Sequence, residues 1–348
     1  ADADADGDID LVVHEWGVFS GGEAHAGPRR WGEMMADKPI LYFYAGEPMT
    51  VDVAVDLPGG QARETWPERV LGESIAWNEV QVSTEPCADH DPFPEYGSGQ
   101  CEDPWSRYCE ASELWDYVVP GAGCLRADDV VSPLLFYAGR LGAAPPALGG
   151  SYCELLTVSD PPGHMTVSAQ AHVVNQLDVP LGPTFLIYRY LDGECYPWEP
   201  CQIRSAHVGT LWLDEVPAGA AIDVEISATM LHAEEGGTVM PPEWLMAEEE
   251  SLAAMLTDAG LTGEEAEALL AGWRHTFLDL QPDDNLVSVP MGMSLAAVYL
   301  LPRSYFDEAL PIQIEPQPRE LVRVGLGHSY LDRACYEDSS SSEPPEAS

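Results

Sequence analysis

The distribution of apolar residues between residues 38 and 67 predicts three successive β-strands. Residues 40–44, ILYFY, form a continuous apolar run, which suits a strand that is buried on both faces. Residues 51–57 then alternate apolar with polar or small side chains, a period of two that gives a strand one buried and one exposed face. Residues 58–60, Pro-Gly-Gly, favour a turn, after which residues 61–66 can return as a third strand. We therefore expect this meander to form the centre of a β-sandwich or barrel.

Further short strand patterns recur along the chain and are separated by turn residues rich in Pro and Gly. Their spacing lacks the strand–helix–strand alternation of a doubly wound nucleotide-binding fold and is typical of an antiparallel sandwich. The predicted fold class is therefore mainly β, with one or more antiparallel β-sandwiches. The additional strands are expected at residues 11–19, 130–137, 153–158, 165–174, 184–190, 207–213, 221–230, 286–289, 294–300 and 321–326.

Two helical patterns interrupt the strands between residues 241 and 277. Gly260 suits the end of the first helix because glycine readily adopts the backbone conformation that stops a helix. Thr262 and Glu265 have the spacing of a capping box at the start of a second helix. The sequence thus predicts an inserted helical hairpin that packs on the sheet.

A turn-rich segment at residues 141–150 divides the predicted strands into two groups. We expect a β domain at residues 11–150, and a β-sandwich domain at residues 151–335 that contains the helical hairpin. Residues 85–127 combine Cys, Pro, Gly and aromatic residues without periodicity, which predicts a disulfide-rich loop inserted in the first domain. The tail at residues 336–348 is too polar to order itself.

The chain is extremely acidic, with 59 acidic and 15 basic residues and a formal net charge of −44. This charge repels phosphate backbones and anionic lipid head groups, which disfavours nucleic-acid partners and electrostatic membrane docking. No stretch has the unbroken apolar length of a membrane span. The charge favours cations and suits a solvent of high ionic strength, so we expect a salt-adapted protein. The alternative is that the acidic residues only keep the surface solvated.

Eight cysteines occur without a C-x-x-C pair, so disulfides explain them better than zinc ligands do. Four of them lie within residues 85–127, where two bridges are expected and three pairings are possible. Cys195 and Cys201 can close a short loop, which leaves Cys153 for Cys335. Disulfides imply an oxidising compartment, and the chain begins without Met. We therefore expect a secreted or cell-surface protein whose export signal has been removed.

The N-terminal segment matches part of a calcium-binding loop of D-x-D-x-D-G type. Its carboxylates come from Asp2, Asp4, Asp6 and Asp10, and hard oxygen ligands at such spacing can wrap a calcium ion. The twelfth position is Val13, where a bidentate glutamate is expected. The segment is therefore either a partial calcium site or a solvated acidic linker.

Three partial catalytic motifs are incomplete. His232 and Glu234 match the H-x-E of zinc deaminases, but no P-C-x-x-C follows them. Residues 292–296, GMSLA, approximate a nucleophile elbow but lack its final glycine. His164 and His172 flank a predicted strand and lie far apart along it. None of these motifs predicts a defined activity.

Several motifs resemble an uncharacterised family of exported bacterial proteins. They are HEWG-x-F at 14–19, PILYFY at 39–44, E-T-W-P at 64–67, LLFYAG at 134–139, GLTGEEAEALLAGWRHTF at 260–277 and LPRSYFDEALPIQIEPQPRELVRVGLG at 301–327. The resemblance is spread over most of the chain and implies secretion and a shared fold, but no activity and no catalytic residue. The cysteine-rich segment at 85–127 departs from the family pattern.

Two functions follow as hypotheses. The first is a secreted or cell-surface protein with a structural, adhesive or binding role, stabilised by calcium, whose partner is another protein, a glycan or further copies of itself. The second is a secreted hydrolase of peptides or polysaccharides, with metal assistance as an option.

The candidate catalytic residues for the hydrolase are the polar residues of two motifs and two C-terminal arginines, namely His14, Glu15, Glu64, Arg274 and Arg303. His14 and Glu15 are adjacent in a predicted strand, so they should point to opposite faces and cannot hold one metal ion together. The alternative for all five is a structural role in hydrogen bonds or ion pairs.

Overall fold

The computed structural model of the chain describes residues 10–21, 34–87, 89–94, 114–115, 117–142, 147–159, 164–196, 199–232, 242–278 and 293–334. Within these residues the protein is mainly β, as the sequence predicts, with two sheets and three helices. The expected strand at residues 286–289, the tail at residues 336–348 and most of the N-terminal acidic segment lie outside the described residues.

Twelve of the described strands form the larger sheet, in the order β17-β9-β10-β13-β12-β11-β14-β16-β1-β2-β8-β4. Neighbours pair antiparallel, except that β1 pairs with β16 and β17 pairs with β9 in parallel. The bounds are β1 Leu11–Gly21, β2 Met34–Ala45, β4 Gln61–Trp66, β8 Leu135–Arg140, β9 Leu148–Ser159, β10 His164–Asn175, β11 Thr184–Tyr196, β12 Glu199–Leu213, β13 Ala221–His232, β14 Met293–Leu300, β16 Glu320–Tyr330 and β17 Asp332–Arg333.

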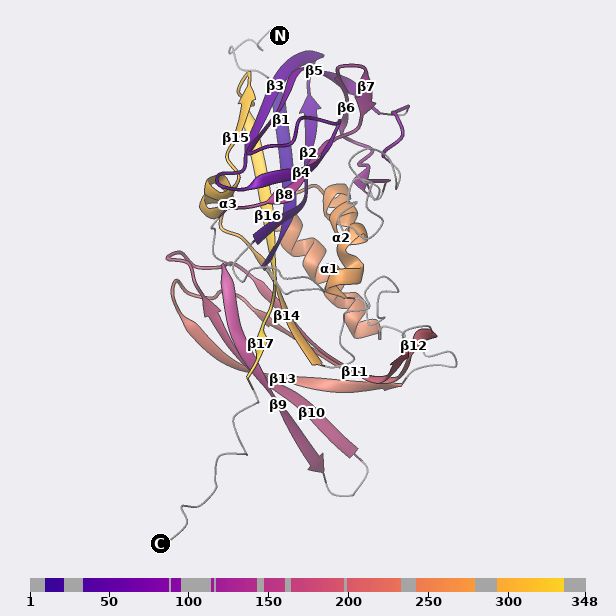
Figure 1. Ribbon diagram of the computed structural model, residues 1–348, viewed down its shortest axis with the longest axis vertical. Coiled ribbons are helices and arrows are strands. Elements are labelled where there is room, and N and C mark those ends of the chain that lie inside the picture. The colour runs from indigo at the N-terminus through magenta and orange to yellow at the C-terminus, as the bar shows by residue number, and fades with distance from the viewer. Residues whose placement is uncertain are drawn as a thin grey trace.

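The smaller sheet has the order β15-β3-β5-β6-β7 and lies at the top of the view in Figure 1. Its strands are β3 Met49–Asp56, β5 Ser74–Pro86, β6 Gly123–Ala127, β7 Val130–Ser132 and β15 Ile312–Glu315. Along β3 the valines at 51, 53 and 55 are buried and Asp52 is exposed, which confirms the predicted alternation. These valines share one core with Leu11, Val13 and Phe43 of the larger sheet, so the two sheets form a sandwich.

The three strands predicted between residues 38 and 67 all form, but they do not make the expected meander. β2 and β4 both pair with β8 in the larger sheet, whereas β3 pairs with β5 and β15 in the smaller sheet. The meander prediction is wrong because the pattern of buried positions identifies a strand but does not identify its hydrogen-bonded neighbour. β5 and the short helix α3 were not expected from the sequence.

The larger sheet closes on itself in the C-terminal half of the chain. β16 pairs with β14 in the middle of the sheet. The chain then continues directly into β17, which pairs with β9 at the end of the sheet remote from β4. Between them, the Leu331 N–H donates to the Leu295 carbonyl oxygen at 2.9 Å. β9, β10, β13, β12, β11 and β14 therefore form a ring that β16 and β17 complete. All of these strands except β16 are labelled in the lower half of the view in Figure 1. Tyr152, Val173 and Tyr188 are buried in its core.

Helices cover the face of the larger sheet that is turned away from the smaller sheet (Figure 1). They are α1 Glu243–Asp258 and α2 Gly263–Phe277, which form the predicted hairpin. The shorter α3 Arg303–Ala309 contacts β16 on the other face, where Phe306 joins the core that the larger sheet shares with the smaller one. The predicted capping box of α2 is confirmed. The Thr262 hydroxyl accepts the Glu265 N–H at 3.2 Å, and the Glu265 carboxylate accepts the Thr262 N–H at 2.7 Å.

A close contact places α2 on the sheet. A Cβ atom added to Gly272 would lie 1.9 Å from the Tyr117 hydroxyl oxygen, so only glycine allows this approach. Lys38, the only lysine of the chain, is buried beside it in β2. The Lys38 Nζ lies 5.3 Å from the ring centroid of Trp273 on α2 and 5.6 Å from that of Tyr117. Cation–π attraction to both rings therefore helps to hold α2 against the sheet.

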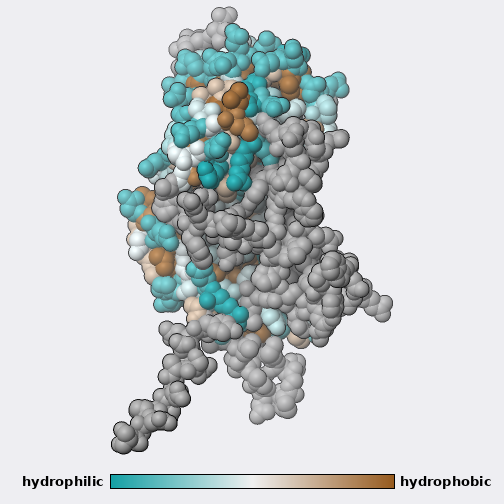
Figure 2. Space-filling view, in the orientation of Figure 1, coloured by the Kyte–Doolittle hydropathy of each residue, from teal (hydrophilic) through white to brown (hydrophobic). Residues whose placement is uncertain are grey.

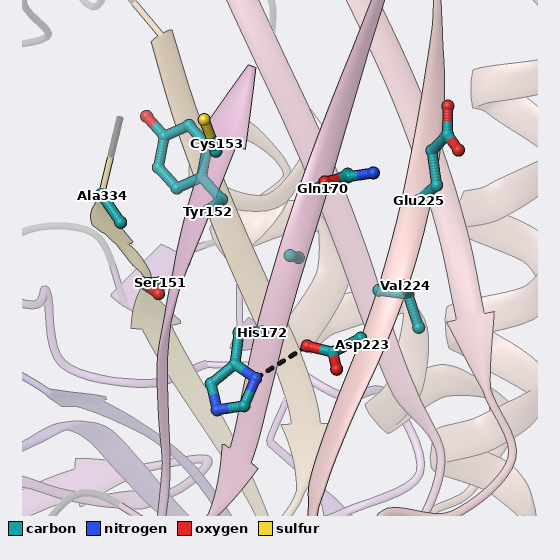
Figure 3. Close-up of a pocket in the computed structure, with 10 residues that line it drawn as sticks. Ser151, Tyr152, Cys153, Gln170, His172, Asp223, Val224, Glu225 and Ala334 are labelled. Carbon is teal, nitrogen blue, oxygen red and sulfur yellow. Dashed lines mark hydrogen bonds and ion pairs between the residues drawn. The ribbon is translucent and has the colours of Figure 1, made fainter. Parts of the chain in front are cut away.

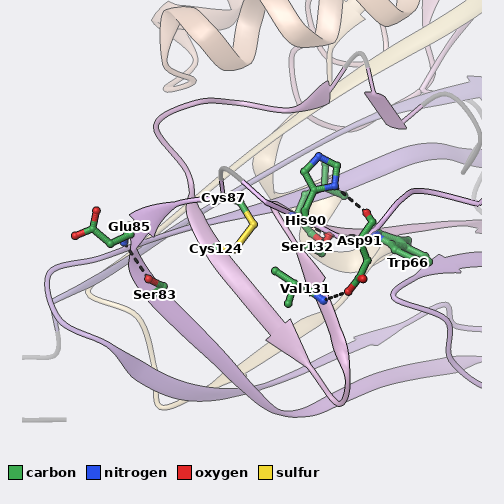
Figure 4. Close-up of a disulfide and its surroundings, with 10 residues drawn as sticks. Trp66, Ser83, Glu85, Cys87, His90, Asp91, Cys124, Val131 and Ser132 are labelled. Carbon is green, nitrogen blue, oxygen red and sulfur yellow. Dashed lines mark hydrogen bonds between the residues drawn. A yellow bond between two sulfur atoms is a disulfide. The ribbon is translucent and has the colours of Figure 1, made fainter.

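The expected domain boundary at residues 141–150 does not separate two sheets, because strands from both sides of it belong to the larger sheet. Cys87 and Cys124 form a disulfide across the predicted insert, as Figure 4 shows. Their two expected companions, Cys101 and Cys109, lie outside the described residues.

The remaining predicted disulfides involve residues that are only partly described. Cys153 is disulfide-bonded, but its expected partner Cys335 lies outside the described residues. Cys195 and Cys201 lie on β11 and β12, next to the paired residues of one hairpin, and their side chains are outside the described part. Both pairings therefore stay predictions.

The described surface over the smaller sheet is mainly hydrophilic in the view of Figure 2, and hydrophobic side chains show there only in small groups. Among the described residues, the large hydrophobic side chains that are exposed are Val70, Trp115, Met230 and Met246, which belong to different segments. Across the same ranges, no helix combines the length and the apolar character needed to span a bilayer.

Candidate functional site

His14 and Glu15 point to opposite faces of β1, as the sequence predicts. The His14 Nδ1 lies 2.8 Å from the Glu265 carboxylate on α2, and the Tyr44 hydroxyl donates to the same carboxylate at 2.7 Å. Burial alone would raise the pKa of Glu265, but the hydrogen bonds from His14, Thr262 and Tyr44 outweigh burial and lower that pKa. His14 therefore ties the capped end of α2 to the sheet.

Glu15 belongs to a buried ion-pair network on the other face. Its carboxylate accepts hydrogen bonds from the Tyr137 hydroxyl and from the Arg323 Nε. The Arg323 Nη1 donates to Asp307 at 2.7 Å, and its Nη2 donates to the Leu310 carbonyl oxygen at 2.7 Å. Burial alone would lower the pKa of Arg323, but the neighbouring Glu15 raises it, so the guanidinium stays charged.

The other three predicted catalytic residues lie in separate places. Glu64 is buried on β4, at the edge of the larger sheet. Arg274 lies on α2 with its Nη2 at 3.4 Å from Glu249. Arg303 begins α3 and donates to Asp307 at 2.8 Å, which links it to the network of Glu15. The structure thus connects Glu15 with Arg303 but does not bring the five residues together in one pocket.

The proposed calcium ligands are described only in part. Asp2, Asp4 and Asp6 lie outside the described residues. The Asp10 Oδ1 accepts a hydrogen bond from the Arg319 Nη1 at 2.7 Å, and both side chains are about half exposed. In the part of the chain that the structure describes, no group of three or more His, Cys, Asp or Glu residues is placed to hold a metal ion.

A cavity of about 420 Å³ lies over the outer face of the ring, on β9, β10 and β13 (Figure 3). Its polar side chains form two rows across these strands, set by the strand register. His172 pairs with Ser151 on one side and Asp223 on the other, and Gln170 pairs with Glu225. These five residues are called the polar face below.

The local sequence explains why these side chains share one face. Along β10 the buried Ala171 and Val173 alternate with the exposed Gln170 and His172, the period of two that a half-buried strand requires. β9 approaches β10 so closely at Gly150 that an added Cβ atom would lie 2.0 Å from the His172 carbonyl oxygen, and only glycine avoids this clash. Gly150 has a φ of 143°, which favours glycine further.

The polar face offers donors and acceptors to a ligand rather than an apolar surface. The His172 Nδ1 lies 2.8 Å from the Asp223 Oδ1, and the two side chains are 50% and 87% exposed. Such an exposed pair contributes little stability, but it fixes the orientation of the imidazole ring. Gln170 and Glu225 are exposed beside it. The arrangement can therefore form several hydrogen bonds to a polyhydroxylated ligand that lies along the strands.

The sequence indicated this site only weakly. His172 stands out as one of two histidines that flank a predicted strand, but its partner on the face is Asp223 of a later strand and not His164. Ser151, Gln170 and Glu225 carry no motif, and the alternation with apolar residues shows only that they are the exposed half of their strands.

Neither a scan of protein-family models nor a search of curated proteins gave a match to the sequence. Among solved structures, the chain is similar to the yeast delta-COP-I mu-homology domain, both alone and complexed with the Dsl1 WxWxV peptide. Identities are 8% and 9% and TM-scores are 0.27 and 0.26, with 93% of this chain and 96% of each of those chains covered.

A further similar structure is Bacteroides uniformis beta-glucuronidase 2 covalently bound to cyclophellitol-6-carboxylate aziridine. The identity is 8% and the TM-score 0.20, with 84% of this chain and 26% of that chain covered. These likenesses are too low to carry an argument about function.

Proposed function

We propose that the protein is an acidic secreted or cell-surface protein with a binding role, and that it holds a neutral glycan on the polar face. The observation that carries the proposal is the cavity over β9, β10 and β13, whose two rows of polar side chains are aligned by the strand register. The Cys87–Cys124 disulfide supports an oxidising compartment and therefore an extracytoplasmic location.

The chemistry of the polar face favours a glycan over other ligands. Each sugar hydroxyl both donates and accepts a hydrogen bond, and the face supplies carboxylate acceptors at Asp223 and Glu225 together with the amide of Gln170. Neighbouring strands are about 4.8 Å apart, and side chains on one face repeat about every 7 Å along a strand, so several hydroxyls of one chain can be met. The net charge of −44 repels anionic polymers, which disfavours acidic glycans.

Affinity electrophoresis in native gels that contain a neutral polysaccharide tests the proposal. Separate gels would hold starch, xylan, glucomannan or mixed-linkage glucan, with a gel free of polysaccharide as reference. We expect at least one of these polysaccharides to retard the wild-type protein. The double variant Gln170→Ala/Glu225→Ala should lose the retardation, because it removes one of the two polar rows.

The matched control is the double variant Ser227→Ala/Thr229→Ala. Both residues are exposed on β13, on the same face as Glu225, but they do not line the cavity. This control should be retarded as strongly as the wild type. Mobility that no gel changes, or a Gln170→Ala/Glu225→Ala variant that is retarded like the wild type, would contradict glycan binding on this face.

A further inference from the structure

An exposed aromatic side chain, Trp115, lies in the chain between Cys87 and Cys124, which form a disulfide. Trp115 is 56% exposed, and among the described residues it is the aromatic one that stands with the exposed large hydrophobic side chains. Its ring meets Phe93 edge-on, with centroids 5.1 Å apart, and lies 5.2 Å from the His90 ring. Trp115, Phe93 and His90 are called the Trp115 platform below.

The platform rests on a rigid base. Phe93 is buried and packs edge-on against Trp66, whose Nε1 donates to the Ser132 hydroxyl at 3.1 Å. Asp91 forms two hydrogen bonds with Val131, one through its N–H at 2.9 Å and one through its carboxylate at 2.7 Å (Figure 4). The indole is therefore held in one orientation before any ligand arrives, which lowers the entropic cost of binding.

The charge around the platform selects the ligand. His90 of the platform is flanked in the chain by Asp89 and Asp91, both of them acidic. The chain as a whole carries a charge of −44. A cation is attracted both by this field and by the negative face of the indole ring, whereas an anion is repelled by both.

We propose that the Trp115 platform binds the arginine or lysine side chain of a basic segment in a partner protein. The guanidinium or ammonium group stacks over the exposed indole face, and the negative charge of the chain attracts the other basic side chains of the segment. This site is independent of the glycan proposed for the polar face, because the two share no residue.

Titration with a fluorescently labelled hexa-arginine peptide tests this proposal by anisotropy at about 0.15 M and 0.5 M salt. The hexa-citrulline peptide has nearly the same shape without the charge and serves as the ligand control. Trp115→Leu should weaken hexa-arginine binding by about two- to thirtyfold, because it removes the cation–π contact but keeps an apolar side chain. Trp115→Phe should lose less, because it keeps an aromatic face.

The control variant is Met246→Leu, which alters an exposed apolar side chain on α1 and should bind like the wild type. The general attraction of a polycation to an acidic protein falls with salt but is equal in all variants. A difference in hexa-arginine affinity between the wild type and Trp115→Leu therefore measures the contribution of the platform. Equal hexa-arginine affinity in the wild type and Trp115→Leu would overturn the proposal, and so would equal binding of hexa-citrulline. Loss of neutral-polysaccharide retardation in Trp115→Leu with unchanged hexa-arginine binding would also overturn it and would assign the platform to a sugar.

Discussion

Removal of the cation from the buried Glu15 network should destabilise the fold strongly. In Arg323→Met a side chain of similar length remains, but the Glu15 carboxylate keeps only the Tyr137 hydroxyl as a partner. Both charged side chains are at most 1% exposed, so solvent cannot replace the lost partner. Breaking a buried pair on one side costs about 3–5 kcal/mol. For a chain of 348 residues, unfolding entropy at the midpoint is about 0.7 kcal/mol/K, so the melting midpoint should fall by about 4–7 °C.

Differential scanning calorimetry of four proteins checks this reasoning. In the double variant Glu15→Gln/Arg323→Met the orphaned charge is gone and the amide can still accept the Tyr137 hydroxyl, so much of the loss should be recovered. Asp128→Asn removes the pair between the exposed Asp128 and Arg69 and should change the midpoint by about 1 °C or less. A midpoint of Arg323→Met within about 1 °C of the wild type would refute the argument, as would a double variant less stable than the single one.

Three further predictions concern pH, salt and calcium. Because folding lowers the pKa of Glu265, the ionised carboxylate stabilises the fold above the ordinary glutamate pKa of about 4.3, and this stabilisation is lost as the pH falls below that value. The urea midpoint of Glu265→Gln should therefore depend less on pH below about pH 4.3 than that of the wild type. Because raising salt from about 0.01 M to 1 M shortens the screening length from about 30 Å to 3 Å, the thermal midpoint should rise along a sodium chloride series, and a flat or falling midpoint would show that the acidic residues do not repel each other. If the N-terminal Asp segment holds calcium, a chelator at ordinary salt should lower the thermal midpoint, and an unchanged midpoint would remove calcium from the proposed function.

Local patterns predicted the elements well where one face of an element is buried. β4 has the predicted bounds, and the valines of β3 alternate as expected. The capping box at Thr262 and Glu265 sets the start of α2 because both of its hydrogen bonds are made within three residues of the chain. Information of this kind is local, so the sequence alone contains it.

The arrangement of these elements depends on pairings that the local pattern does not contain. β1 pairs in parallel with β16, so Val12 lies beside Glu320 from the other end of the chain. β17 has only two residues, yet it closes the ring by pairing with β9. A strand of two residues has no detectable period, and a parallel partner need not be close in sequence. Two separate domains were therefore expected where one sheet runs through both.

The same limit applies more strongly to the polar face. The alternation of apolar and polar residues along β10 indicates that His172 is exposed, but it does not identify Asp223 as its neighbour 51 residues later. That neighbour is set by the register of β10 with β13, which depends on the buried side chains of both strands and on the close approach at Gly150. Glu15 shows the opposite case, because it is a polar residue in an apolar strand and its carboxylate pairs with Arg323, 308 residues later. A polar residue in a buried strand therefore indicates a partner to be found, and only the sheet register shows whether that partner is structural or lies on an open face where a ligand can bind.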